Sequence, residues 1–386
     1  MKTVPVVIIG GGLSGLCAAF LLEKRGIDYV LLEARDTLGG RILAGKPIQN
    51  TTSNPVVSDS TFLVDQFDLG PSWFWPEYQQ QFDRLLKELH LHSFAQFEEG
   101  DMMVERVLGE AVQRTTGFSS SPTSMRINGG MTALIQSLYN RLEPSRVMTN
   151  QIVRKISKVE ESIVIECEND GNEDSSWRAQ HLLLALPPRL VSETIIFEPV
   201  LPVELKRQWH HTATWMAPHA KYFAVYDHPF WREQGLSGAA RSAQGPMVEM
   251  HDASIPEGSA ALFGFIGIPA STRQNMSDDV LKMHCRAQLV RLFGTQAATP
   301  NREYLKDWSK DKFTATNMDA SSDGQHSVAP NAQAISGVWK ECLTGIGSEW
   351  SLQFSGYLAG AVDAAHVGVQ GLAIPNLHLN DKVPLK

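Results

Sequence analysis

The sequence has few cysteines and no excess of basic residues, and these two shortages exclude several classes of protein. The 386-residue chain has four cysteines, which lie far apart and form no C-x-x-C pair: Cys17, Cys167, Cys285 and Cys342. This usage disfavours a metal cluster and favours a reducing compartment. With 34 basic and 42 acidic side chains, a net charge of -8 and no basic block, the chain is not expected to bind nucleic acid.

Long apolar segments are also scarce. Lys2 and the apolar run after it imitate a signal peptide, but three glycines interrupt the run. Charged Glu23, Lys24 and Arg25 stand where a cleavage site would be needed. No terminal apolar helix is present, so we expect no membrane attachment and a cytoplasmic protein.

Common catalytic motifs are missing as well. The sequence contains neither H-E-x-x-H nor a G-x-S-x-G elbow. His210 and His211 are adjacent and are expected to face apart on a strand, while His219 and His251 have no third ligand at a useful spacing. We therefore predict no metal site and treat these histidines as structural or surface residues.

The first 33 residues, in contrast, carry a strong pattern. A β-branched strand at 6–9 leads into three glycines, a helix at 13–24 and a second strand at 29–32. Gly10, Gly12 and Gly15 have the G-x-G-x-x-G spacing of a dinucleotide-binding turn, with Leu13 and Ser14 at the start of the helix. The helix start can hold a pyrophosphate without any basic side chain.

An acidic residue follows the second strand at the expected distance. Glu33 lies about 20 residues after the glycines, where a carboxylate can accept hydrogen bonds from both ribose hydroxyls. A second glycine pair with a fixed cation, Gly39, Gly40 and Arg41, comes soon after it. A plain nicotinamide dehydrogenase does not require this addition.

With these motifs, residues 6–42 resemble the flavin-containing amine oxidase superfamily, which includes monoamine, polyamine and L-amino acid oxidases. The resemblance implies that the dinucleotide is FAD. It further implies an α/β fold, in which a Rossmann-like FAD-binding domain carries an inserted, discontinuous α+β substrate domain. The predicted division is 1–78, 125–212 and 308–386 for FAD binding, and 79–124 and 213–307 for the substrate.

Later segments match further family motifs. Residues 68–76 resemble the segment beside the flavin ring, residues 126–131 a second return to the cofactor, and residues 345–349 with 355–361 the closing motif. Thr132 can cap the helix expected at 132–142. The resemblance implies these cofactor-binding residues beyond the glycine turns and Glu33: Ala34, Arg35, Gly70, Pro71, Ser72, Val153, Gly347, Ser348 and Glu349.

The resemblance also implies catalytic and substrate residues. Lys221 corresponds to the lysine that holds a water against flavin N5; without the resemblance, an exposed lysine on an edge strand would be favoured. Trp308 corresponds to a tryptophan near that water, and Tyr357 to an aromatic that contacts the substrate. Trp73 is assigned to the substrate cavity, and Met318 stands where some members place a second cage tyrosine.

The attachment of the flavin is also implied by the family pattern. In members with a covalent flavin, a cysteine follows the tryptophan nine residues later, and this sequence has Asn317 there. We therefore expect FAD to be bound non-covalently.

Other elements follow from periodicity. Helices are expected at 79–91 and 201–209 and, with Ser277 as its cap, at 277–293. Strands are expected at 102–107, 181–186, 222–226 and 262–268, and residues 147–156 and 162–168 alternate like a hairpin.

The expected reaction is oxidation of a small-molecule amine to an imine by hydride transfer to flavin N5, with molecular oxygen as acceptor. Two alternatives stay open: an FAD enzyme that desaturates a carbon–carbon bond, and a flavoprotein with a binding role only. The sequence leaves the substrate and the oligomeric state undecided. An amino acid substrate would need a cation such as Arg126, Arg189 or Arg241 in the cavity.

Overall fold

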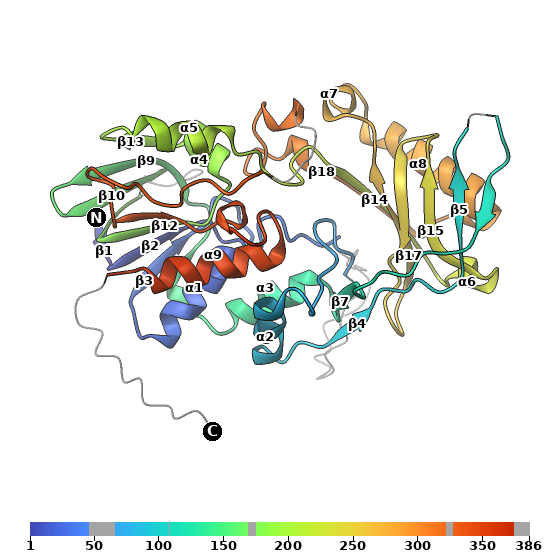
Figure 1. The fold of residues 1–386 in the computed structure, drawn as a ribbon, viewed down its shortest axis with the longest axis horizontal. Helices are drawn as coiled ribbons and strands as arrows, with labels where there is room; N and C mark the ends of the chain where they lie inside the picture. The colour runs from blue at the N-terminus through green and yellow to red at the C-terminus, as the bar shows by residue number, and fades with distance from the viewer. Residues whose placement is uncertain (46–65, 108, 169–174, 322–326, 374–386) are drawn as a thin grey trace, which may run out of the picture.

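The computed structural model describes residues 1–45, 66–107, 109–168, 175–321 and 327–373. The chain forms two lobes, each built on its own sheets (Figure 1). We call them the dinucleotide lobe, which contains the first β-α-β unit, and the antiparallel lobe, which contains most of residues 220–307. Among the described residues, no helix is both long and apolar enough to cross a membrane.

The dinucleotide lobe is organised around a five-stranded parallel sheet in the order β19-β12-β2-β3-β8. Its strands are β2 (Val6–Ile9), β3 (Tyr29–Leu32), β8 (Val147–Met148), β12 (His181–Leu184) and β19 (Leu343–Gly345). The central strands are buried on both faces, as continuous apolar runs in a parallel sheet require. Three distant parts of the chain build this sheet, and the predicted fold class is confirmed.

Helices cover this sheet. Helix α1 (Leu13–Lys24) packs against α9 (Leu358–Gln370) and α3 (Met131–Tyr139). Helix α2 (Gln80–Glu88) contributes Phe82, Leu85 and Leu86 to the apolar core that α1, α3 and α9 form with the sheet. The division into domains stays a prediction, but α2, which we placed with the substrate domain, packs with the dinucleotide lobe.

A second five-stranded sheet adjoins the first, in the order β1-β11-β10-β9-β13. It consists of β1 (Lys2–Thr3), β9 (Ile152–Val159), β10 (Ser162–Glu168), β11 (Ser175–Ala179) and β13 (Ile196–Glu198), with α4 (Pro188–Thr194) and α5 (Val203–His211) nearby. The expected hairpin exists, but its first strand does not begin at residue 147. Residues 147–148 instead pair in parallel with β3, so that expectation was wrong in part.

The antiparallel lobe contains a seven-stranded sheet in the order β18-β14-β17-β16-β15-β5-β6. Its strands are β5 (Asp101–Glu105), β6 (Gln113–Thr115), β14 (Ala220–Tyr226), β15 (Leu236–Ser242), β16 (Met247–Asp252), β17 (Ala260–Ile266) and β18 (Arg302–Asp307). Helix α8 (Asp278–Phe293) packs on this sheet, and Ser277 caps it by accepting the Val280 N–H, as predicted. Strand β14, which carries Lys221, is therefore an interior strand.

Short elements complete the fold. They are β4 (Ser93–Ala95), β7 (Met125–Ile127), α6 (Phe230–Glu233), α7 (Ala270–Arg273) and the 3-10 turns η1 (Pro144–Arg146), η2 (Thr295–Ala298), η3 (Trp308–Lys310), η4 (Asp319–Ser321) and η5 (Ser348–Trp350).

Two local predictions were wrong. Thr132 does not cap α3; the helix begins after Gly130, and the Asp68 carboxylate accepts the Met131 N–H at 2.7 Å. A carboxylate from a distant segment thus replaces the expected hydroxyl. His210 and His211 do not face apart on a strand; they end α5, and their rings contact edge to face with centroids 5.5 Å apart.

Candidate active site

A cavity of about 610 Å³ lies between the two lobes. Its lining runs from the glycine turn after β2 to Lys221 on β14 and Phe265 on β17. This volume lies within the usual range for small-molecule and cofactor sites. The predicted residues that line it are Gly10, Gly12, Leu13, Ser14, Glu33, Ala34, Arg35, Gly39, Gly40, Arg41, Gly70, Pro71, Ser72, Trp73, Val153, Lys221, Trp308, Gly347, Ser348 and Tyr357.

Three predicted site residues lie elsewhere. Gly15 packs beneath the glycine turn, and Glu349 lies behind Arg41 with 1% of its surface exposed. Met318 has 41% of its surface exposed and is not part of the cavity lining. The structure therefore brings the cofactor set together but leaves the expected second cage position outside the cavity.

The glycine turn is built by close backbone contacts. Gly10 has a φ of +106°, and a Cβ on it would lie 2.6 Å from the Ala185 carbonyl oxygen. A Cβ on Gly15 would lie 1.9 Å from the Gly10 carbonyl oxygen, so α1 sits directly on the turn. A Cβ on Gly12 would meet no atom closer than 3.8 Å, which leaves the cavity side of the turn open.

This turn fits the pyrophosphate of a dinucleotide. Gly12 is the N-cap of α1 and supplies no side-chain hydrogen bond to the first N–H groups of the helix. Those donors and the positive end of the helix dipole face the cavity side, where they can bind phosphate oxygens. The second glycine turn lies against the first, because the Gly39 N–H donates to the Gly11 carbonyl oxygen at 2.9 Å.

Glu33 is fixed at the end of β3. Its carboxylate accepts the Gly11 N–H at 2.6 Å and the Arg35 N–H at 2.8 Å, and only 3% of the residue is exposed. Each carboxylate oxygen can accept more than one hydrogen bond. Glu33 can therefore still bind ribose hydroxyls from the position that the sequence predicts. Val153 also lines the cavity.

Arg41 joins the two ends of the sequence. It makes a bidentate pair with Glu349, at 2.5 and 2.9 Å, and donates to the Ser348 hydroxyl at 3.0 Å. Burial raises the pKa of Glu349, but the charge and hydrogen bonds of Arg41 outweigh this and hold that pKa below its ordinary value. Glu349 thus fixes Arg41, and Arg41 and Ser348 line the cavity.

Lys221 is almost completely buried, with 2% of its surface exposed. Its ammonium donates to the Asp68 carbonyl at 2.8 Å, the Gly70 carbonyl at 3.1 Å and the Ser72 hydroxyl at 2.7 Å. Burial lowers the pKa of Lys221, whereas the Asp68 carboxylate acts in the opposite direction. The alternative, an exposed lysine on an edge strand, is therefore wrong. That Lys221 holds a water against flavin N5 stays a prediction.

Aromatic side chains form much of the rest of the wall. The Trp73 indole donates to the Gln96 side chain at 2.8 Å, and the Trp308 indole donates to the Leu69 carbonyl at 3.1 Å. Tyr357 contacts Trp75 edge to face, with ring centroids 6.3 Å apart. This end of the cavity is apolar and held in place by hydrogen bonds behind the rings.

Sequence reasoning missed several lining residues. Trp215 and Met216 reach the cavity from the segment between α5 and β14, and Phe265 and Phe313 reach it from other segments. A signal for the first pair was present, because two large apolar residues stand in a connection where polar residues are usual. In the described part of the chain, no cluster of three or more His, Cys, Asp or Glu side chains could hold a metal ion.

Known proteins resemble this chain over most of its length. Residues 110–367 match the family described as flavin containing amine oxidoreductase, and residues 8–89 match an NAD(P)-binding Rossmann-like domain. The chain is 24% identical to the flavin-containing amine oxidase B of Sus scrofa, over 98% of this chain and 87% of that protein. It is 23% identical to putrescine oxidase of Kocuria rosea, over 82% of this chain and 84% of that protein.

Solved structures show the same fold. Putrescine oxidase bound to putrescine matches with a TM-score of 0.75 at 21% identity, over 95% of this chain and 98% of that one. Cyclohexylamine oxidase from Brevibacterium oxydans matches with a TM-score of 0.75 at 20% identity, over the same shares. Because the family match spans more than half of the chain, this protein belongs to the flavin-containing amine oxidoreductase family and is an FAD-dependent oxidoreductase.

Proposed function

We propose that this protein oxidises a small-molecule amine to an imine, with molecular oxygen as the final acceptor. The observation that supports this most is one cavity that joins a dinucleotide turn to a buried lysine and an aromatic wall. The amine loses a hydride from its α-carbon and a proton from its nitrogen. When bound, FAD supplies the acceptor for the hydride at N5, and oxygen takes up the two electrons and two protons as hydrogen peroxide.

The protein's own residues bind, orient and exclude water. The first N–H groups of α1 and Glu33 would hold the pyrophosphate and ribose, while Arg41 and Ser348 would contact the middle of the cofactor. Lys221 fixes the 68–72 segment, which forms part of the cavity wall. We assign no conventional catalytic base to this site.

The aromatic end favours the reactive form of the amine. Trp73, Trp308 and Tyr357 present apolar surface to the cavity. Burial in such surroundings disfavours an ammonium ion, so a bound amine loses its proton more readily than it does in water. A neutral amine has the nitrogen lone pair that imine formation requires.

We also propose that FAD is bound non-covalently. None of the four cysteines, all of which lie in the described part of the chain, is among the residues that line the cavity. Asn317 stands where covalent members of the family have cysteine. After acid precipitation, all of the flavin absorbance should remain in the supernatant; flavin in the protein pellet would contradict the proposal.

The absence of paired cysteines also supports a cytoplasmic location. All four thiols are free in the structure. Cell fractionation with an antibody against the protein would test this proposal.

The main experiment is an anaerobic titration of the purified flavoprotein with a panel of amines. The panel should include benzylamine, cyclohexylamine, putrescine, spermidine and L-amino acids. We expect at least one amine to bleach the long-wavelength flavin absorption, and air to restore it with one hydrogen peroxide per amine. A panel that leaves the spectrum unchanged would contradict an amine oxidase. Bleaching without rapid restoration by oxygen would favour a dehydrogenase that uses another acceptor.

A further inference from the structure

The wall of the cavity includes a segment that belongs to neither the glycine motifs nor the other family motifs. Residues 212–219 connect α5 in the dinucleotide lobe to β14 in the antiparallel lobe, and Trp215 and Met216 line the cavity from this connection. Met216 has a φ of +65°, which is uncommon for a residue with a branched or long side chain. A strained backbone of this kind persists only where the surroundings hold it in place.

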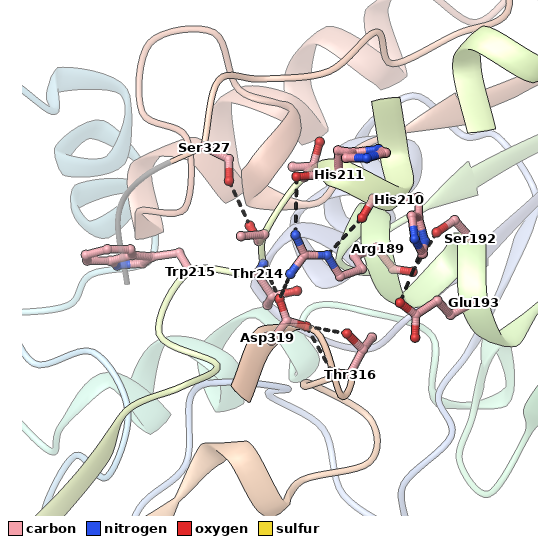
Figure 2. A network of polar contacts seen from close by, with 12 residues as sticks. Arg189, Ser192, Glu193, His210, His211, Thr214, Trp215, Thr316, Asp319 and Ser327 are labelled. Carbon is pink, nitrogen blue, oxygen red and sulfur yellow. Dashed lines mark hydrogen bonds and ion pairs between the residues drawn. The ribbon is translucent and has the colours of Figure 1, made fainter. Parts of the chain in front are cut away.

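A buried carboxylate holds the beginning of this segment (Figure 2). Asp319 in η4 is fully buried, forms an ion pair with Arg189 of α4, and accepts the Thr214 N–H at 3.0 Å. Its other oxygen accepts the Thr316 N–H at 2.9 Å. Each carboxylate oxygen therefore has a partner, and the residue next to Trp215 is fixed by one of them.

Arg189 extends this network to the end of α5. Its guanidinium donates to the carbonyl oxygens of His210 at 2.9 Å and His211 at 3.2 Å. In Figure 2 the Trp215 side chain points away from these groups. The network thus fixes the backbone on both sides of the α5 terminus, while the indole is directed elsewhere.

Two further contacts fix Trp215 itself. Its carbonyl oxygen accepts a hydrogen bond from Arg41 at 3.1 Å. Its Cβ lies against Gly356, where an added Cβ would be 2.6 Å away. Gly356 directly precedes Tyr357, the aromatic residue assigned to the substrate, and both Trp215 and Tyr357 line the cavity.

We propose that Trp215 is a specificity-determining residue of the amine cavity and that Asp319 positions it. The inference rests on the proposed function, since it names the part of the cavity that selects the body of the amine. Trp215 and Tyr357 both contribute aromatic side chains to the cavity lining, of which Met318 is not a part. An amine with a ring can pack on this surface, and a small amine that fills only the reacting end cannot.

The test uses two amines that have no α-hydrogen and so cannot be oxidised: α,α-dimethylbenzylamine, which has a ring, and tert-butylamine, which has none. Their dissociation constants are measured on the FAD-loaded protein from the perturbation of the flavin spectrum. We expect Trp215→Ala to weaken binding of the ring amine about tenfold and to leave tert-butylamine within about twofold. Equal effects on both amines, or no effect on either, would overturn the inference.

Asp319 is tested through its coupling to Trp215. Asp319→Ala alone should weaken binding of the ring amine. In a Trp215→Ala background it should cause no further loss of binding, because both changes remove the same surface. If the two losses instead multiply, Asp319 does not act through Trp215. Should Asp319→Ala fail to fold, Asp319→Asn, which keeps an oxygen for the Thr214 N–H, is taken through the same cycle.

A matched control is available in the antiparallel lobe. Glu105 is also a buried carboxylate, 3% exposed, and pairs with Arg291 at 2.5 Å, but it does not line the cavity. Glu105→Gln should leave both dissociation constants unchanged. If this variant selectively weakened binding of the ring amine, loss of any buried ion pair would have the same effect, and the role of Asp319 would be overturned.

The outcome separates this inference from the proposed function. If the ring amine shows the expected pattern but no oxidisable amine bleaches the flavin, amine oxidation is wrong and the role of Trp215 stands. If amines are oxidised and Trp215→Ala leaves the ratio of the two dissociation constants unchanged, the inference alone is wrong.

Discussion

The two ends of the cavity are held by different kinds of contact. At the dinucleotide end, backbone packs against backbone: the Gly39 N–H donates to the Gly11 carbonyl oxygen at 2.9 Å, and Gly10 lies directly against the Ala185 carbonyl oxygen. At the reacting end, side chains meet backbone from far away: Lys221 bonds the Asp68 carbonyl oxygen, 153 residues earlier. At Gly10 and Gly15 the first end has no room for an added Cβ, whereas at the second end we expect that a side chain can be exchanged without loss of the fold.

The largest expected effect is at the glycine turn. In Gly15→Ala, the new Cβ would lie 1.9 Å from the Gly10 carbonyl oxygen, so α1 must move away from the turn. We expect the free energy of unfolding to fall by about 3 kcal/mol and FAD to be lost. Urea denaturation and the ratio of flavin to protein absorbance measure the two effects.

Gly26→Ala is the control for this change. Gly26 has a φ of +63° but has no atom within 4 Å of an added Cβ. It should cost only about 1 kcal/mol and keep its FAD. Equal flavin content in both variants would show that FAD binding does not depend on close packing at Gly15.

The next effect is at the reacting end, where we expect a loss of rate without loss of cofactor. Lys221→Met removes the donor to Asp68, Gly70 and Ser72 but keeps a long apolar stem. Turnover with the best amine should fall about 100-fold, a typical result of losing a positioned donor, while FAD content stays near that of the wild type. Stopped-flow absorbance separates the reduction of the flavin from its reoxidation.

Lys155→Met is the matched control, because Lys155 pairs with Glu198 on the surface of the second sheet. Its turnover should equal that of the wild type. Turnover of Lys221→Met within about threefold of the wild type, at full FAD content, would contradict the role of Lys221 and weaken the contrast between the two ends.

A smaller effect, dependent on pH, is expected where the two ends meet. Glu349→Gln removes the charge that pairs with the Arg41 guanidinium and should cost about 2 kcal/mol near neutral pH, because the amide oxygen can still accept a hydrogen bond. Arg41 holds the pKa of Glu349 below its ordinary value of 4.5, so the native carboxylate binds fewer protons than the unfolded one. This contribution is complete above that value and is lost as the pH falls through the native pKa.

The measurement is denaturation of the wild type and Glu349→Gln over a series of pH values. The difference in their free energies of unfolding should be constant above pH 4.5 and should shrink in acid. Glu204→Gln, which breaks an exposed pair with Arg207, should show little difference at any pH. A difference for Glu349 that grows in acid would contradict the assigned direction of its pKa shift.

Much of the fold could be predicted because its signals are local. The strands at 6–9 and 29–32 and the helix at 13–24 agree residue for residue with the structure, since each has its own periodicity and boundary residues. Two of the failures occurred where the partner is distant. Strand β8 pairs with β3, more than 100 residues earlier, and α3 is capped by Asp68 from another segment.

The site shows the same division. Spacing alone led to Gly10, Gly12, Gly15 and Glu33, because all four belong to one β-α-β unit. Lys221 could be named only by resemblance, since its acceptors at 68–72 are brought to it by the fold of two lobes. Neither spacing nor resemblance identified Trp215, because its position depends on Asp319 and Gly356, which come from different parts of the chain.

The smallest expected effect concerns Met318, which the family pattern had placed in the substrate cage. Its side chain is 41% exposed and does not line the cavity, whereas Trp215 does. Met318→Tyr would restore the family residue, yet it should change the KM for an amine less than twofold, because the exposed side chain does not line the cavity. Steady-state kinetics with a ring amine and a small amine measure this. A selective gain of threefold or more for the ring amine would mean that Met318 reaches the substrate, and that the reacting end is built by the family pattern rather than by Trp215.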